Sequence, residues 1–255
     1  MSRLVVHQVR YELIKFWRDP QAVFFTVALP VVFLVIFAAV FGNDTLDDRS
    51  GLKVSTYYVP GIIALGVMAA AFVTLAIGLV EQRERGILKR LRATPLPAGA
   101  FIASRAALAV LLTALIAVVL TLIGRVLYGV TIPSDRAPGL LLTLAVGTVA
   151  FCCLGFALSG LVRTANAAPA IANMLTLPLQ MISGIFFPVN LIPDGVLVVA
   201  KVFPVYHLAQ GLLDGFDPNG PAGGINVVAL AVLTAWGALG AVVAARTFRW
   251  EPQGR

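Results

Sequence analysis

Residues 22–41 read AVFFTVALPVVFLVIFAAVF, a run of twenty residues without a charged side chain. A helix of about 20 apolar residues is long enough to cross the hydrocarbon core of a bilayer, which is about 30 Å thick. The length and composition of this run are therefore those of a transmembrane helix.

The composition of the whole chain agrees with that interpretation. Of its 255 residues, 59% are hydrophobic and 12% are charged, whereas soluble domains carry about 25% charged residues. Alternation of apolar and polar residues with a period of two, typical of barrel strands, is absent, so the apolar runs are predicted to be helices. The predicted fold class is all-α integral membrane with six transmembrane helices, at about 22–41, 59–80, 101–127, 139–161, 167–187 and 225–245.

The distribution of basic residues predicts the orientation of these helices. Six spans place both ends of the chain on one side of the membrane. With this assignment, 14 of the 19 lysines and arginines lie on that side and 5 on the other. Because cytoplasmic loops are enriched in lysine and arginine, we expect both termini to be cytoplasmic.

The N-terminal segment is charged throughout and is not predicted to span the membrane. Its apolar residues nevertheless recur at helical spacing, which is typical of a helix lying in the membrane interface; they are Val6, Val9, Leu13, Phe16 and Trp17. A soluble helical tail is the alternative. The predicted organisation is an interfacial segment (1–21), a transmembrane domain (22–245) and a cytoplasmic tail (246–255).

Residues 81–97 read EQRERGILKRLRATPLP and lie between the second and third predicted spans. Gly86 is expected to end the helix that precedes it, and Ile87, Leu88 and Leu91 form a small apolar face. Such an element suits docking onto a soluble partner. A basic anchor for anionic lipid is an equal alternative. The candidate docking residues are Glu81, Arg83, Glu84, Arg85, Gly86, Leu88, Leu91, Thr94 and Pro95.

A second unusual segment follows the fifth predicted span. Residues 189–203 are apolar, but they are too few and too interrupted to cross the membrane. The expected structure is an outer re-entrant hairpin between helices 5 and 6, bounded by prolines and buried against protein. Its candidate residues are Ser183, Gly184, Phe187, Pro188, Leu191, Pro193 and Pro204.

Polar and small residues mark helix faces within the spans. Asn166, Asn173 and Gln180 are seven residues apart, so they lie near one face of the fifth span. They are candidates for a substrate path or a dimer seam, or for hydrogen bonds between helices. Small residues spaced four apart predict close helix packing; they are Gly66, Ala70, Thr74 and Gly78 in the second span, and Gly237, Ala241 and Ala245 in the sixth.

The two unusual segments together resemble permease subunits of the ABC-2 type transporters. The first resembles the family's E-x-x-x-G-x-[LI]-x-x-L-x-x-T-P signature, from Glu81 or Glu84 through Gly86, Leu91, Thr94 and Pro95. The second resembles its S-G-x-x-F-P-x-x-x-L-P element, followed by an N/F-P-x-x-[YH] element. Ile87-Leu88-Lys89 departs from the Thr-Leu-Glu expected in the first. The resemblance covers the whole chain.

That resemblance implies an exporter in the bacterial plasma membrane. A second permease half, identical or homologous, would complete the path, and two copies of a separate cytoplasmic ABC ATPase would bind ATP and magnesium. Residues 81–97 and the N-terminal helix would contact the ATPase, and the outer hairpin would form a lid. The implied substrates are amphipathic or lipid-like, of the drug, glycolipid or polysaccharide class.

The sequence itself argues against several other functions. It holds no G-x-x-x-x-G-K-[ST] phosphate loop, so we expect no cofactor on this chain and no ATPase activity of its own. We find no catalytic constellation and no metal-ligand spacing, and the basic residues between apolar runs do not indicate a nucleic-acid partner. The alternative is an ion-coupled secondary carrier, which normally needs carboxylates within the spans.

Overall fold

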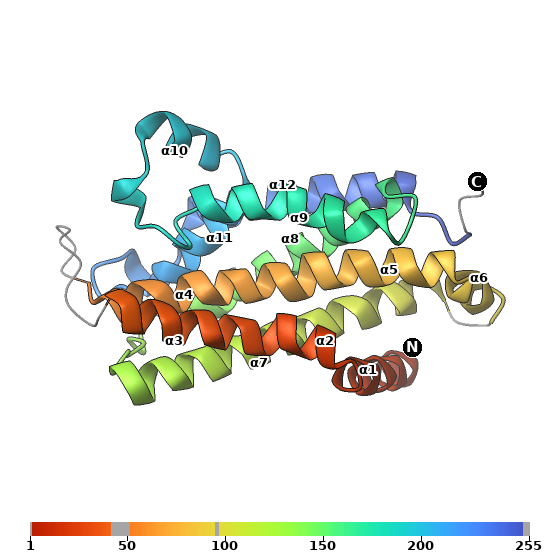
Figure 1. Cartoon of the computed structure of the whole chain (residues 1–255), viewed down its shortest axis with the longest axis horizontal. Helices are drawn as coiled ribbons and strands as arrows, with labels where there is room; N and C mark the ends of the chain where they lie inside the picture. The colour runs from red at the N-terminus through yellow and green to blue at the C-terminus, as the bar shows by residue number, and fades with distance from the viewer. Residues whose placement is uncertain (1, 42–51, 95–96, 252–255) are drawn as a thin grey trace.

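The computed structural model describes residues 2–41, 52–94 and 97–251. Within these ranges the chain is helical and contains no β-strand, which confirms the predicted all-α class. The membrane-type helices run along the long axis of the molecule (Figure 1). They are α2 (Pro20–Val23) with η1 (Phe24–Ala28) and α3 (Leu29–Phe41), α4 (Val54–Val67) with η2 (Met68–Thr74) and α5 (Leu75–Glu84), α7 (Ala98–Tyr128), α8 (Ala137–Leu161), α9 (Ala167–Ile182) and α12 (Val227–Thr247).

Helix length separates α9 from the others. In the part of the chain that the structure describes, five helices are long and apolar enough to cross a membrane, or six if the bent pair formed by α10 (Asp194–Ala200) and α11 (Pro204–Leu213) is counted as one. The 16 residues of α9 reach about 24 Å, less than the bilayer core. The predicted span 167–187 is therefore too long, because its helix ends at Ile182. The count of six spans stays a prediction.

The two ends of the bundle carry different elements. The helix α1 (Ser2–Trp17), the end of α12 and the short helix α6 (Ile87–Arg92) lie at one end, and α10 lies at the other (Figure 1). The helix α1 packs against α7 and stops before Pro20. Asp19 begins the next helix, because its carboxylate accepts a hydrogen bond from the Ala22 amide at 3.1 Å.

Glycine permits the close approach of α8 and α12. A Cβ atom on Gly237 would lie 3.1 Å from Ala150 Cα, and one on Gly240 would lie 2.9 Å from the Cys153 carbonyl carbon. The small face predicted for α12 is therefore confirmed at Gly237, whereas Ala241 and Ala245 are exposed and do not take part in this contact. The buried face of α12 comprises Ala229, Leu233, Gly237 and Gly240, so it turns to Gly240 rather than continuing to Ala241.

The small face of the second span, which begins at Gly66, is in close contact with neighbours along only part of its length. A Cβ on Gly66 would lie 2.6 Å from Ile116 Cγ2 of α7, whereas one on Gly78 would have no neighbour within 4 Å. Thr74, in the π-helical stretch η2, faces Thr26 of η1, with hydroxyl oxygens 3.4 Å apart. The predicted face is thus used by different neighbours along its length.

We predict that Gly240→Leu lowers the free energy of unfolding by about 1–3 kcal/mol or more, because its side chain would meet the backbone of α8. Ala241→Leu is the matched control, since Ala241 is adjacent and exposed. Thermal unfolding of the purified chain in detergent measures both. Equal melting temperatures for the two variants would contradict the packing described.

Candidate functional site

The end of α5 turns sharply into α6. Gly86 adopts φ +69°, a left-handed conformation that favours glycine. The helix α5 ends at Glu84 and α6 begins at Ile87, so the predicted break at Gly86 is confirmed. This turn places α6 at the tip of the bundle (Figure 1).

The apolar residues of α6 point in different directions. Leu88 is completely buried, and Leu91 is partly buried against the core. Ile87 is 38% exposed, and Lys89, Arg90 and Arg92 are exposed beside it. Leu88 therefore anchors α6, and the exposed surface of this helix consists of Ile87 and the basic side chains.

Arg83 does not lie on that surface. Its side chain is buried and donates hydrogen bonds to the Ser159 carbonyl at 2.6 Å, to the Val162 carbonyl, and to the Arg163 carbonyl at 3.2 Å. The last carbonyls of a helix lack partners within the helix and carry a partial negative charge. Arg83 therefore caps the C-terminal end of α8.

Glu84 binds the other end of the same loop. Its carboxylate accepts a hydrogen bond from the Ala165 amide at 2.6 Å, just before α9 begins at Ala167. A negative charge is favourable at a helix N-terminus. Two adjacent residues of opposite charge thus fasten residues 162–166 to the end of α5.

The remaining predicted residues of this loop are on the outside. Arg85 pairs with Glu81 at 3.8 Å, and both side chains are substantially exposed. The Thr94 hydroxyl donates to the Leu91 carbonyl at 2.6 Å and ends α6. Pro95 lies outside the described residues.

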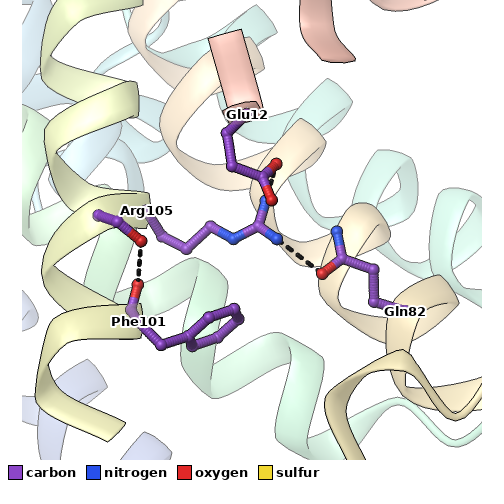
Figure 2. Close-up of polar contacts among 5 residues, drawn as sticks. Glu12, Gln82, Phe101 and Arg105 are labelled. Carbon is purple, nitrogen blue, oxygen red and sulfur yellow. Dashed lines mark hydrogen bonds and ion pairs between the residues drawn. The ribbon is translucent and has the colours of Figure 1, made fainter. Parts of the chain in front are cut away.

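A buried charge network, which the sequence reasoning missed, joins α1 to the bundle (Figure 2). Arg105 of α7 is 2.7 Å from the Glu12 carboxylate and donates to Gln82 Oε1 at 2.6 Å. Its guanidinium lies 5.2 Å from the centre of the Phe101 ring. The available signal was Glu12, the single acidic residue among residues 1–18.

At the opposite end, side chains of α4 hold the start of residues 183–204, which are named the outer segment because the sequence predicts that they face outward. The Tyr57 hydroxyl lies 2.5 Å from the Gly184 carbonyl and 3.2 Å from the Phe187 carbonyl. The Tyr58 hydroxyl donates to the Phe186 carbonyl at 3.3 Å. These hydroxyl groups bond backbone carbonyls that follow the end of α9 at Ile182 and therefore have no partner within a helix.

The segment after α9 contains more helix than the sequence predicted. The 3-10 turn η3 (Val189–Leu191) and α10 are followed by α11, bent by 96° from α10. The helix α11 packs against α4, α8 and α12. The sequence analysis did not predict α11, because its ten residues are too few to cross the membrane and were included in the short segment between the last two spans.

The prolines of the outer segment mark its corners. Pro188 precedes η3, Pro193 precedes α10, and Pro204 opens α11. Ser183 donates a hydrogen bond to the Leu179 carbonyl, while Phe187 and Leu191 are exposed. Pro188 and Pro204, which were predicted to bound the segment, therefore lie at the starts of η3 and α11. The re-entrant hairpin itself stays a prediction.

Two side chains fix the turn between α10 and α11. Trp236 of α12 donates a hydrogen bond to the Val202 carbonyl at 2.9 Å. Its ring also stacks on the Phe203 ring, with the ring centres 6.0 Å apart. His207 Nε2 lies 2.8 Å from the Lys201 carbonyl. The outer segment is thus held at both ends, while Val198 on α10 is 64% exposed.

The three polar residues of α9 do not share one environment. Gln180 is buried, with Nε2 3.9 Å from the sulfur of Met68, whereas Asn166 and Asn173 are exposed. The buried stripe of α9 repeats every four residues and comprises Ala168, Ala172, Thr176 and Gln180. Within the described ranges, no group of three or more His, Cys, Asp or Glu side chains is arranged to hold a metal ion.

The sequence has recognisable relatives. Residues 4–216 match the sequence profile of the family described as ABC-2 type transporter. The chain is similar to YvfS of Bacillus subtilis (strain 168), which is named as a transport permease, with 25% identity over 211 residues that cover 82% of this chain and 84% of YvfS. It is also similar to YadH, an inner membrane transport permease of Escherichia coli (strain K12), with 23% identity over 75% of each chain.

We predict that Glu12→Gln lowers the free energy of unfolding by about 3 kcal/mol, because it leaves the buried Arg105 charge without its counter-ion. The control is Glu81→Gln, which removes the same charge from an exposed pair and is expected to cost less than about 1 kcal/mol. Unfolding of both variants by denaturant in micelles gives the comparison. The buried network would be unimportant if the two variants lost equal stability.

Proposed function

Because the chain belongs to the ABC-2 type transporter family, we propose that it is the permease subunit of an ATP-driven exporter. Members of this family are membrane transport subunits that generally work with a cytoplasmic ABC ATPase. The apolar helices and the inner-membrane relative support a multi-pass protein of a bacterial inner membrane. The proposal adds the direction of transport, the substrate class and the assembly.

The arrangement of α6 carries the proposal. This helix projects at the tip of the bundle, is anchored by buried Leu88, and presents Ile87 among basic side chains. The positive charge of this end, which also holds α1 and the end of α12, supports its placement in the cytoplasm. An ATPase docked there would act directly on α5 through Gly86.

The opposite end supports a gate for an amphipathic or lipid-like substrate. Apolar side chains on α10 are exposed, while its flanks are bound by Tyr57, Tyr58 and Trp236. An apolar segment held in place at the outer end of the transport path could contact the apolar parts of such a substrate. A second permease half, identical or homologous, would supply the other wall, and the exposed Asn173 is available to face it. ATP and magnesium would be bound by two copies of the ATPase.

Affinity purification of the tagged full-length chain from its own membranes tests the proposal. We expect an ATP-hydrolysing protein to copurify and ATP to drive export from inverted vesicles. Transport that depends on an ion gradient and continues without ATP would support the ion-coupled carrier instead and overturn the proposal.

We predict that Ile87→Asp reduces ATPase stimulation by the chain by about tenfold, which corresponds to about 1.4 kcal/mol of lost docking energy. The side chain is partly exposed, so the fold should persist. Ile87→Val keeps the apolar contact and is the matched control. ATP hydrolysis by the reconstituted complex is the measurement, and normal stimulation with Ile87→Asp would exclude Ile87 from the docking surface.

We also predict that Gly195→Cys reacts with a membrane-impermeant thiol reagent added from outside, in a Cys152→Ser, Cys153→Ser background. A Cβ at Gly195 has no neighbour within 4 Å, so the new thiol is accessible. Val205→Cys is the control, because Val205 is buried on α11 and should react slowly. Labelling of Gly195→Cys from the cytoplasmic side alone would invert the proposed orientation.

A further inference from the structure

Among the residues that the structure describes, π-helix occurs in two places, and these two places touch. The stretch η1 lies in the first span and η2 in the second, and they are in contact where the two spans run side by side (Figure 1). A π-helix bonds each amide to the carbonyl five residues earlier, so its turn is wider than an α-helical turn, and it is frequent at functional sites. The contact therefore brings two widened turns together.

A proline explains the wide turn of η1. Pro30 has no amide hydrogen, so the Thr26 carbonyl, four residues earlier, has no α-helical partner. The Leu29 amide instead bonds the Phe24 carbonyl, five residues before it. The wide turn of η1 is thus fixed by the covalent structure of the chain.

No such residue explains the wide turn of η2. Its sequence, MAAAFVT, contains neither proline nor glycine, and alanine has the strongest preference for the α-helix. Local preference and observed conformation therefore disagree, so contacts with other helices hold η2 in the π form. Such a disagreement is typical of functional sites. A turn that is held only by packing can change when the packing changes.

The polar contacts that hold η2 are weak. The hydroxyl oxygens of Thr26 and Thr74 are 3.4 Å apart, longer than the ~2.7–2.8 Å usual between hydroxyl groups. Gln180 Nε2 of α9 lies 3.9 Å from the sulfur of Met68, and a thioether is a weak acceptor. These contacts can therefore be broken and remade at little cost.

The face of α8 that meets η2 carries no side chain at the closest point. A Cβ atom on Gly155 would lie 3.0 Å from the Ala71 carbonyl oxygen and 3.2 Å from that of Phe72. Backbone thus lies directly against backbone. Because no side chain interlocks there, the turns of η2 can shift past Gly155.

The two ends of the same span are held firmly. Tyr57 bonds the Gly184 carbonyl at one end, and Arg83 bonds the carbonyls that end α8 at the other. Because both ends stay in place, the extra residue of η2 can move along the span but cannot leave it. Each residue that the wide turn passes rotates by about 100°, the angle per residue of an α-helix.

We propose that the wide turn of η2 moves along the second span during each ATP-driven cycle, with η1 as the fixed surface beside it. The proposal rests on the proposed function, because the cycle is that of the exporter. The shift presents different side chains to α7, α8 and α9, which η2 contacts. The second span thus changes its surface without moving as a whole.

Deletion of Ala70 tests the wide turn, because it leaves a regular α-helix with both ends of the span in place. The melting temperature in detergent should stay close to that of the unaltered chain, while ATP hydrolysis by the complex with the copurified ATPase should fall by about tenfold or more. Deletion of Ala109 from the regular helix α7 is the control. It rotates one half of α7 against the other and should lower the melting temperature sharply.

A disulfide across the contact provides the second test. Thr26→Cys with Thr74→Cys, in a background without the native cysteines, allows oxidation to fix η2 to η1. ATP hydrolysis by the complex should stop on oxidation and return on reduction. The matched control is Thr113→Cys with Thr148→Cys, because these hydroxyl oxygens are 3.1 Å apart and join α7 to α8 outside both π-helical stretches. Oxidation of the control pair should leave hydrolysis unchanged.

Hydrogen exchange in nanodiscs tests the mobile turn without the ATPase. Amides of residues 68–74 should exchange at least about tenfold faster than those of residues 112–118 in α7, and deletion of Ala70 should remove the difference.

The outcomes separate this inference from the proposed function. If no ATP-hydrolysing protein copurifies with the unaltered chain, the proposed function fails, and hydrogen exchange still decides whether the turn moves. Equal exchange in the two segments overturns the inference. So does normal ATP hydrolysis by the Ala70 deletion or by the oxidised pair at Thr26 and Thr74. An Ala70 deletion that unfolds as readily as the Ala109 deletion shows that η2 holds no removable residue.

Discussion

Inside a bilayer the backbone has no water to bond, so each helix end near hydrocarbon needs donors or acceptors from the protein itself. Side chains supply them at several breaks in this fold. Arg83 binds the carbonyls at the end of α8, Tyr57 binds those that follow α9, and Trp236 binds the turn before α11. Arg136 likewise donates to the Pro218 and Pro221 carbonyls at 2.6 and 3.0 Å. The positions of the loops follow from these bonds.

One continuous helical unit carries donors at both ends. The 31 residues Val54–Glu84 comprise α4, η2 and α5. Tyr57 and Tyr58 hold the outer segment at one end, and Arg83 and Glu84 hold the loop 162–166 at the other. The outer segment and α6 are therefore connected through a single element. Its π-helical middle, η2, also contacts α8, where Gly155 would place a Cβ 3.0 Å from the Ala71 carbonyl.

Burial divides the basic residues of the charged end into two groups. Arg83 and Arg105 are inside the protein, where each bonds several partners and fixes the arrangement of α8 or α1. Lys89, Arg90 and Arg163 are exposed and give this end of the bundle a positive electrostatic potential. A buried charge is stabilised only by nearby partners, whereas an exposed one acts over about 10 Å of electrolyte. The same residue type is thus structural in one place and available for recognition in another.

The sequence alone determined the class of the fold, because bilayer thickness and hydrophobicity act locally on each run of apolar residues. It also located the break at Gly86 and the prolines Pro188 and Pro204 that bound the segment after α9. Only the tertiary structure decided that Leu88 and Arg83 face inward, that Gln180 is separated from Asn173, and that Glu12 meets Arg105. These outcomes depend on contacts between residues that are far apart in the chain, and neither hydropathy nor spacing records which helix faces come together.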